Sequence, residues 1–212
     1  MFDWDSMKNK IILADNKDVM EDIPDKYFEL AIVDPPYGID RYNKNDGGNS
    51  NKIKSFGDKD KNWNNIKPDN LYFEELFRIS KNQIIWGGNN FKLPLSEYFI
   101  IWDKGQMMPS FAQCEMAWTN CKKPAKIFKQ RTVEQGRIKI HPTQKPIALY
   151  RWLLQNYAKP GDKIIDTHSG SGSLACACHL EKFDFLAIEK DEDYYKSSVE
   201  RLETLRSQGV LF

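Results

Sequence analysis

The sequence has few of the residues from which metal sites and disulfide frameworks are built. It contains four cysteines and three histidines. The cysteines are spaced unlike those of a zinc ribbon or a disulfide framework, standing at Cys114, Cys121, Cys176 and Cys178. We therefore expect reduced cysteines that mostly pack in the interior, and no metal site.

Long hydrophobic runs are also missing. No stretch of about eighteen apolar residues occurs, which argues against a membrane-spanning helix. The opening residues Met1-Phe2-Asp3-Trp4 do not begin a signal peptide. We expect a cytoplasmic protein without membrane contact, and its 212 residues are enough for one sizeable α/β domain.

A large net charge is absent, but the charge is unevenly distributed. The whole chain carries +1, whereas residues 41–67 carry +4, residues 122–139 carry +6 and the remainder carries −9. Lysine-rich loops are often merely solvated. Here one basic segment follows soon after Tyr37 and the other lies directly before His141, and this placement favours a polyanionic partner such as DNA.

Asp34-Pro35-Pro36-Tyr37 is the first segment that suggests chemistry. It follows an apolar run at 30–33, which predicts a strand buried on both faces. The two prolines stiffen the backbone and leave carbonyl acceptors, while Asp34 adds a carboxylate and Tyr37 a flat ring. Such a set suits a planar group carrying an NH2, such as a nucleobase amine. A rigid turn after a strand would explain the segment about as well, so a second motif has to decide.

The second motif is Lys163-Ile164-Ile165-Asp166-Thr167-His168-Ser169-Gly170-Ser171-Gly172-Ser173. It predicts a strand, an acidic residue, a glycine turn and a helix that begins near Ser173. Gly170 and Gly172 allow a ligand to approach the backbone closely. The next predicted strand ends in Glu189, and an acid at this position typically accepts hydrogen bonds from a ribose diol. Together these features predict a nucleoside-ligand site.

Taken together, the two motifs resemble those of the amino-methyltransferases that use S-adenosylmethionine. In that family a [D/N/S]-P-P-[Y/F/W] segment holds the target amine, and a D-x-x-x-G-x-G-type loop holds the cofactor. Here the amine segment comes first, as in the β class of DNA adenine-N6 and cytosine-N4 methyltransferases. The segment His141-Pro142-Thr143-Gln144-Lys145-Pro146 is similar to one that this class carries before its cofactor loop.

The resemblance implies an α/β fold with a Rossmann-like class I methyltransferase sheet, mostly parallel with an antiparallel strand pair, and circularly permuted. It also leads us to expect the strand at 10–14 beside the strand at 30–33. We predict one domain over 1–212, with a mobile basic loop at about 38–67 and a short target-recognition insert at about 105–140. Related enzymes are often dimers, so a homodimer is left open.

The resemblance also implies roles for individual residues. The catalytic segment is Asp34, Pro35, Pro36 and Tyr37. The expected S-adenosylmethionine contacts are Asp15, Asp34, Thr143, Lys145, Asp166, His168, Gly170, Gly172 and Glu189, although Asp15 could equally be a helix N-cap. The expected DNA contacts are Lys126, Lys129, Arg131 and Arg137.

One departure from the family pattern concerns the cofactor loop, where the usual D-P-F-x-G-S-G-T becomes Asp166-Thr167-His168 and ends in Ser173. The leading prediction is DNA adenine-N6 methylation, with or without a restriction partner. Cytosine-N4 methylation and a catalytically idle DNA-binding relative are the alternatives.

Overall fold

Eight strands form one sheet in the computed structural model, in the order β1-β8-β7-β2-β3-β5-β4-β6. The structure describes residues 2–38, 67–105, 112–131, 140–141 and 143–208. The strands are β1 Lys10–Leu13, β2 Phe28–Val33, β3 Ser80–Trp86, β4 Phe99–Asp103, β5 Cys114–Thr119, β6 Lys126–Lys129, β7 Lys163–Asp166 and β8 Asp184–Glu189.

The strand directions confirm the predicted sheet. All neighbouring pairs from β1 to β3 are parallel, and β4 pairs in parallel with β6. Among the strands that the structure describes, only β5 runs antiparallel to its neighbours, which are β3 on one side and β4 on the other. The sheet is therefore mostly parallel with an antiparallel pair, as predicted, while the circular permutation remains a prediction.

The expectation that the opening strand lies beside the strand at 30–33 was wrong. β1 pairs with β8, and β2 pairs with β7, so the last two strands of the chain separate them. Burial gives the physical reason. In β1 only Ile11 is buried, which suits an edge strand, whereas three or more residues of β7 and of β8 are buried.

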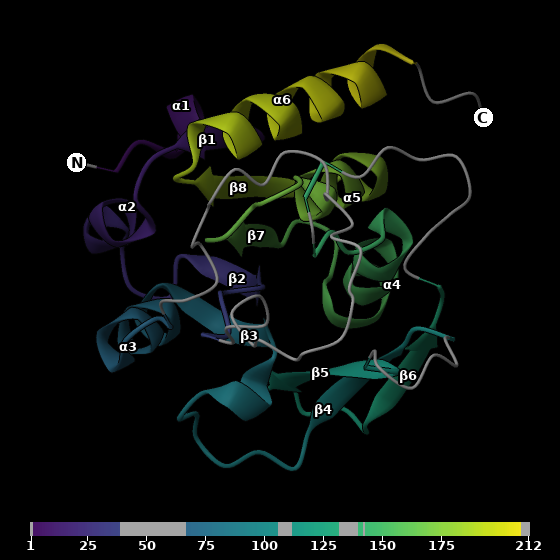
Figure 1. Ribbon diagram of the computed structural model, residues 1–212. Helices are drawn as coiled ribbons and strands as arrows, with labels where there is room; N and C mark the ends of the chain where they lie inside the picture. Colours follow the sequence, from purple (N-terminus) through teal and green to yellow (C-terminus); the bar gives the residue numbers. More distant parts are fainter. Residues whose placement is uncertain (1, 39–66, 106–111, 132–139, 142, 209–212) are drawn as a thin grey trace, which may run out of the picture.

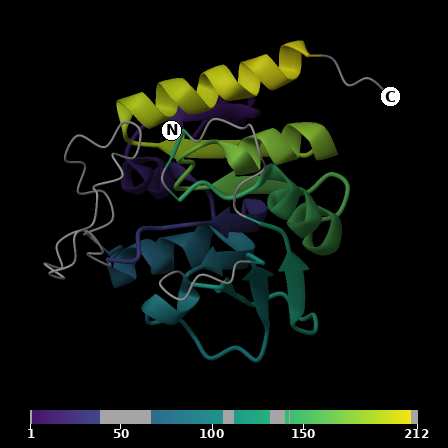
Figure 2. The same ribbon diagram turned by 45° about the vertical axis from the view of Figure 1, so that its right-hand side comes forward.

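Helices cover both faces of this sheet (Figures 1 and 2). They are α1 Trp4–Met7, α2 Asn16–Asp22, α3 Asn70–Ile79, α4 Ile147–Tyr157, α5 Ser173–Glu181 and α6 Glu192–Ser207, with a 3₁₀ turn η1 at Gly88–Asn90. One hydrophobic cluster joins the sheet to α4, α5 and α6, and a second joins it to α2 and α3. The result is a three-layer α/β architecture.

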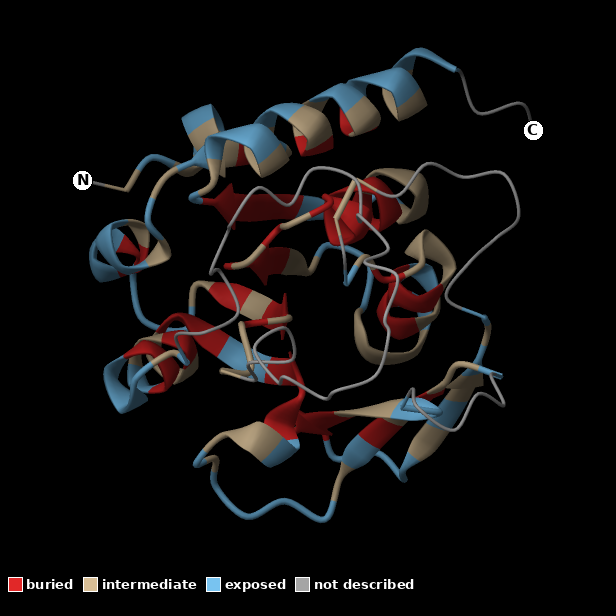
Figure 3. Cartoon of the chain, viewed as in Figure 1, coloured by how far each residue is buried: buried red, intermediate tan, exposed pale blue. Residues whose placement is uncertain are grey.

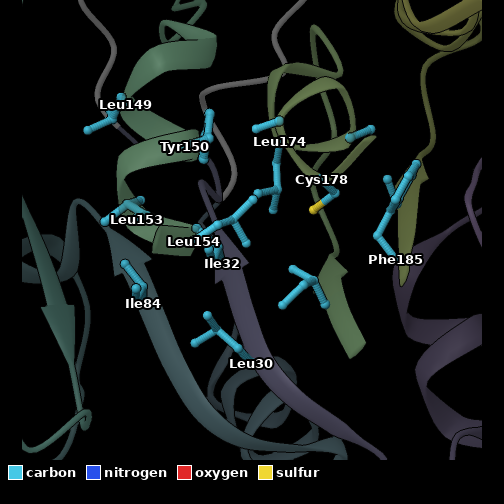
Figure 4. Packing of buried hydrophobic residues seen from close by; sticks show 14 of the residues in the cluster. Leu30, Ile32, Ile84, Leu149, Tyr150, Leu153, Leu154, Leu174, Cys178 and Phe185 are labelled. Atoms are coloured by element: carbon cyan, nitrogen blue, oxygen red, sulfur yellow. The ribbon is translucent and has the colours of Figure 1, made fainter. Parts of the chain in front are cut away.

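The alternation of side chains along each strand creates these two clusters. Leu30 and Ile32 of β2 face α4 and α5, whereas Ala31 and Val33 face α2 and α3. Figure 4 shows Leu30, Ile32 and Ile84 directed toward the leucines of α4. The central strands are almost wholly buried (Figure 3). A rigid sheet of this kind holds the roots of the loops at its edges still.

Three acidic residues meet at one edge of the sheet. Because β2, β7 and β8 are parallel neighbours, their carboxyl ends lie on the same side. Asp34 directly follows β2, Asp166 ends β7 and Glu189 ends β8. In open α/β sheets this edge is where ligands bind.

Much of the predicted DNA-binding surface lies outside the described residues. Of the predicted basic loop at about 38–67, the structure describes residues 38 and 67. Within the predicted target-recognition insert, residues 106–111 and 132–139 also lie outside, whereas β5 and β6 are described.

Candidate active site

The Asp34–Tyr37 segment leaves the end of β2 and folds back on itself. The Tyr37 hydroxyl donates a hydrogen bond to Oδ1 of Asp34 at 2.6 Å. Burial, reinforced by the negative charges of Asp34 and Glu115, raises the pKa of Tyr37 well above its ordinary value. Tyr37 is therefore a neutral donor held against an acidic side chain.

Gly87 makes room for the Tyr37 ring. Its φ of +65° lies in the left-handed region, and a Cβ placed there would stand 2.3 Å from Cε1 of Tyr37. Both the backbone conformation and the contact require glycine. The turn after β3 thus forms one wall of the site.

Lys145 is a buried cation in contact with the Asp34 carboxylate. Its side chain is 2% exposed, and its ammonium donates a hydrogen bond to Oδ2 of Asp34. The same ammonium lies 3.2 Å from Oε2 of Glu115 and 5.3 Å from the centre of the Trp86 ring. The predicted contact of Lys145 with the cofactor remains a prediction, because in this structure its partners are carboxylates of the protein.

Glu115 and Lys104 are site residues that sequence reasoning missed. Glu115 lies on β5, and Lys104, just beyond β4, is 2.5 Å from its Oε1. Burial opposes the charge of Glu115, but the ammonium groups of Lys145 and Lys104 outweigh it and lower the pKa to about 2. The one available signal was an acidic residue inside the mostly apolar strand predicted at 113–118.

The glycine turn between β7 and α5 is built as predicted. Gly170 has φ +50° and Gly172 has φ +68°, conformations that favour glycine. The Ser173 hydroxyl donates to the carbonyl oxygen of Lys145 at 2.8 Å. It also accepts a hydrogen bond from Arg201 of α6 at 2.9 Å. The serine at the end of the loop therefore ties the turn to the Lys145 segment.

Glu189 fixes the same turn from the neighbouring strand. Its Oε2 accepts the N–H of Gly170 at 2.7 Å, and its Oε1 accepts the N–H of Asp191 at 2.9 Å. Each carboxylate oxygen keeps a second lone pair for another donor. The predicted ribose-binding acid is thus held at the glycine turn.

Asp166 is a buried carboxyl at the centre of the edge. Oδ1 accepts the N–H of His168 at 3.0 Å. Burial, together with the charges of Asp34 and Glu189, raises the pKa of Asp166 to about 8. Asp166 is therefore largely protonated near neutral pH, and a cationic ligand held beside it would favour its ionised form.

His168 stands where the family usually has phenylalanine, and it is hydrogen-bonded on both ring nitrogens. Asn16 donates from Nδ2 to the carbonyl oxygen of Thr167 and to Nε2 of His168, both at 3.1 Å. Nε2 is therefore the acceptor, so Nδ1 carries the proton and donates to Oγ1 of Thr167 at 3.0 Å. Burial lowers the pKa of His168 to about 3, which agrees with a neutral ring.

Two further residues of this hydrogen-bond network, Asn16 and Tyr72, were not predicted from the sequence. The Tyr72 hydroxyl shares a 2.6 Å hydrogen bond with Thr167, and the Tyr72 ring packs edge-on against His168. Asn16 opens α2 and Tyr72 lies in α3. Thr167 and His168 thus replace the usual Pro-Phe pair with polar contacts to two helices.

Asp15 takes the alternative role that the sequence left open. It is the N-cap of α2 and accepts the N–H of Lys17 at 3.0 Å. Its predicted contact with the cofactor adenine remains a prediction.

The His141–Pro146 segment lies beside the glycine turn. The Thr143 N–H donates to Nδ1 of His141 at 3.3 Å. The His141 ring lies 4.4 Å, centre to centre, from the Tyr194 ring, and a Cβ on Gly170 would be 3.6 Å from it. Burial lowers the pKa of His141 to about 4. Thr143 and His141 therefore lie at the predicted cofactor side, while Pro142 is outside the described residues.

Two of the predicted DNA contacts lie on β6, and a third lies just beyond it. Lys126 on β6 donates to Oδ1 of Asn156 at 2.6 Å, Lys129 is 76% exposed and 3.8 Å from Asp103, and Arg131 is exposed. Arg137 lies outside the described residues. Lys129 and Arg131 are thus available to a partner.

The residues at the cofactor side fit a polar, cationic ligand. Ser169 has a buried hydroxyl that, among the described residues, has no hydrogen-bond partner. It stands in the glycine turn between Asp166 and Gly170, so it could serve a ligand held there. The described residues contain no group of histidine, cysteine and acidic side chains that could hold a metal ion. In the same residues no helix is both long and apolar enough to cross a membrane.

Comparison with known proteins identifies the family. Residues 59–200, more than half of the chain, match the family model for N6/N4 methyltransferases, described as DNA methylase. The type II methyltransferase M.HinfI of Haemophilus influenzae is 23% identical over 249 aligned residues, which cover 93% of this chain and 69% of that protein. The type II methyltransferase M2.MboI of Moraxella bovis is 27% identical over 139 residues, covering 66% of this chain and 47% of that protein.

Solved structures share the fold. The M1.HpyAVI–SAM complex superposes with a TM-score of 0.59 at 20% identity, covering 91% of this chain and 98% of that one. The cytosine-N4-specific PvuII DNA methyltransferase gives 0.58 at 12% identity, covering 94% and 91%. On the match over residues 59–200, the chain belongs to the DNA methylase family of N6/N4 methyltransferases.

Proposed function

We propose that this protein transfers a methyl group from S-adenosylmethionine to the exocyclic N6 amine of adenine in DNA. One observation carries the proposal: the Asp34–Tyr37 segment and the glycine turn lie at the ends of the adjacent strands β2 and β7. Lys145 joins them, since its ammonium binds Asp34 and its carbonyl oxygen accepts the Ser173 hydroxyl.

The chemistry requires an electrophile beside a held amine. S-adenosylmethionine would supply a methyl group on a positively charged sulfur, which retains the electron pair of the carbon–sulfur bond that breaks. The residues proposed to hold its methionine part are Asp166, His168, Gly170 and Gly172. Glu189 is proposed to accept the ribose hydroxyls, with Thr143, Lys145 and Asp15 as further contacts.

Asp34 and the Pro35 carbonyl are proposed to hold the target amine. The lone pair of an adenine amine is delocalised into the ring, which makes it a poor nucleophile. If each of these two acceptors accepts a hydrogen bond from one N–H of the amine, the nitrogen is drawn toward tetrahedral geometry. Its lone pair then becomes available for attack on the methyl group. Catalysis then rests mainly on positioning and electrostatics. Asp34 or water takes the proton that the methylated amine releases.

The target base has to leave the double helix, because the amine cannot be reached inside the stack. Tyr37 supplies a ring on which the flipped base can stack. Its hydroxyl is bonded to Asp34 in the present structure, so the ring and the acceptor are held close to each other. Lys126, Lys129, Arg131 and Arg137 are proposed to contact the phosphates or base edges of the DNA.

We favour adenine over cytosine as the target base because the catalytic segment begins with Asp34, whereas serine is commoner at this position in cytosine-N4 enzymes. Cytosine-N4 methylation is the second candidate. The fold shared with the cytosine-N4-specific PvuII enzyme is the observation that supports it.

The decisive experiment is methyl transfer from radiolabelled cofactor to mixed-sequence DNA, followed by digestion to nucleosides. We expect the label in N6-methyl-2′-deoxyadenosine. Label in N4-methyl-2′-deoxycytidine would support the second candidate. Cofactor binding without any incorporation would support the idle DNA-binding relative.

The matched variants are Asp34→Ala and Asp25→Ala. We expect Asp34→Ala to lower transfer by at least about a hundredfold and cofactor affinity far less, because Asp34 is only one of nine expected cofactor contacts. Asp25 is 77% exposed and pairs with Arg78, so its variant should transfer normally. If Asp34→Ala lost cofactor binding as severely as transfer, the assigned roles would be wrong.

A further inference from the structure

Each oxygen of the Asp34 carboxylate already accepts a donor before any base arrives. Oδ1 accepts the Tyr37 hydroxyl, and Oδ2 accepts the Lys145 ammonium. The proposed function requires one of these oxygens to accept a hydrogen of the target amine. Each oxygen keeps a second lone pair, but an amine that approaches Oδ2 meets the Lys145 ammonium as a competing donor.

The Lys145 ammonium is buried among protein groups. Its side chain is 2% exposed, with the Trp86 and Tyr37 rings 5.3 Å and 5.9 Å from the ammonium. A buried ammonium that loses its carboxylate without a substitute is strongly destabilised. A second acceptor therefore has to stand within reach.

Glu115 provides that acceptor. Its Oε2 lies 3.2 Å from the Lys145 ammonium, yet among the described residues it accepts no hydrogen bond of acceptable angle. The distance is short enough, so a small rotation of the lysine would complete the bond. Oε1 is meanwhile held by Lys104 at 2.5 Å, which fixes the glutamate in place.

We propose that Glu115 is a positioning residue that receives the Lys145 ammonium when the target amine binds Asp34. The inference rests on the proposed function, because the displaced contact is the one that the amine needs. Lys145 moves between two carboxylates and stays charged throughout, and no covalent bond is made or broken in this step.

The charge states agree with this geometry. The two ammonium groups keep Glu115 ionised, as described above. Burial would lower the pKa of Lys145, but Asp34 and Glu115 together raise it. Removing either carboxylate should therefore make Lys145 easier to deprotonate.

The test compares Glu115→Gln with Glu29→Gln in the full-length chain. Glu29 is a matched control, since its side chain is 26% exposed against 23% for Glu115 and it also pairs with a lysine, Lys81. We expect Glu115→Gln to lower kcat for methyl transfer by at least about tenfold, with the cofactor Kd within about twofold of wild type. For Glu29→Gln, both kcat and the cofactor Kd should remain within about twofold of wild type.

A second readout separates positioning from a merely structural role. In Glu115→Gln the alkaline limb of the kcat profile should move to lower pH, because Lys145 has lost one of two neighbouring negative charges. Lys145 titrated by NMR in ¹³C-lysine-labelled protein should show the same downward shift. Glu115→Asp, which keeps the charge, should leave the limb near its wild-type position.

The outcomes are distinct. Wild-type kcat and an unmoved limb in Glu115→Gln would overturn the inference while leaving the proposed function intact. Equal losses of activity and melting temperature in Glu115→Gln and Glu29→Gln would assign Glu115 a structural role. Absence of methyl transfer by the wild-type protein would overturn the proposed function and this inference with it.

Discussion

Glu189 at the end of β8 accepts the backbone N–H of Gly170 in the turn that follows the adjacent strand β7, at 2.7 Å. The acid predicted to bind a ribose and the turn predicted to surround the methionine part are therefore fixed to each other. A change in one is transmitted to the other.

Replacing Glu189 by alanine should weaken both folding and cofactor binding. Two backbone N–H groups lose their acceptor, which costs about 1–3 kcal/mol of unfolding free energy. We expect cofactor affinity to fall by at least about tenfold, measured by calorimetry alongside urea unfolding. Glu192→Ala is the control, because Glu192 is 65% exposed on the next helix. Wild-type affinity in Glu189→Ala would contradict the assigned role.

Asp166 should make folding stability fall as the pH rises. Its pKa of about 8 in the folded protein exceeds the ordinary 3.8, so the folded state binds more protons between these values. Its contribution is complete below about pH 4 and is lost as the pH rises toward 8. Asp166→Asn removes this dependence. Between pH 5 and 8, wild type should lose at least about 1 kcal/mol relative to the variant in urea unfolding. If the unfolding free energies of wild type and Asp166→Asn changed equally with pH, Asp166 would already be ionised at pH 5 in the folded protein.

Replacing Gly87 by alanine should displace the Tyr37 ring. The added Cβ would stand 2.3 Å from the ring, at a φ that costs an L-residue about 1–2 kcal/mol. We expect methyl transfer to fall at least about tenfold, with cofactor affinity near wild type. Gly161→Ala is the matched control, because its φ is +89° and its Cβ would meet nothing within 4 Å. Equal activity of the two variants would show that Tyr37 does not need this wall.

Restoring the family's phenylalanine at position 168 should cost stability at neutral pH. His168→Phe loses the hydrogen bonds to Asn16 and Thr167, so we expect a loss of about 1–2 kcal/mol at pH 7. The pKa of His168 falls from 6.5 to about 3 on folding, so its contribution is present above pH 6.5 and is lost as the pH falls toward 3. The gap between wild type and variant should narrow from pH 7 to pH 4. If the difference in unfolding free energy between wild type and His168→Phe stayed constant in urea unfolding from pH 7 to pH 4, protonation of His168 would not destabilise the folded protein.

The sequence by itself determined the parts of the site that are contiguous in the chain. The strand before Asp34, the glycine turn at Gly170 and Gly172, and the acid at Glu189 are each encoded in a few neighbouring residues. Buried strands show as apolar runs, and left-handed turns show as glycine, because these are local steric requirements. The two motifs, their order and the His141–Pro146 segment together pointed to the N6/N4 methyltransferase family.

Only the tertiary structure decided which side chains meet. It separated β1 from β2 by two strands from the end of the chain, and it placed Glu115 against Lys145. It also bound His168 to Asn16 across 152 positions of sequence. Strand neighbours depend on how much of each strand the whole core buries, and ion pairs depend on which strands then lie side by side. Neither the strand order nor the ion pairs can be predicted from any short stretch of residues.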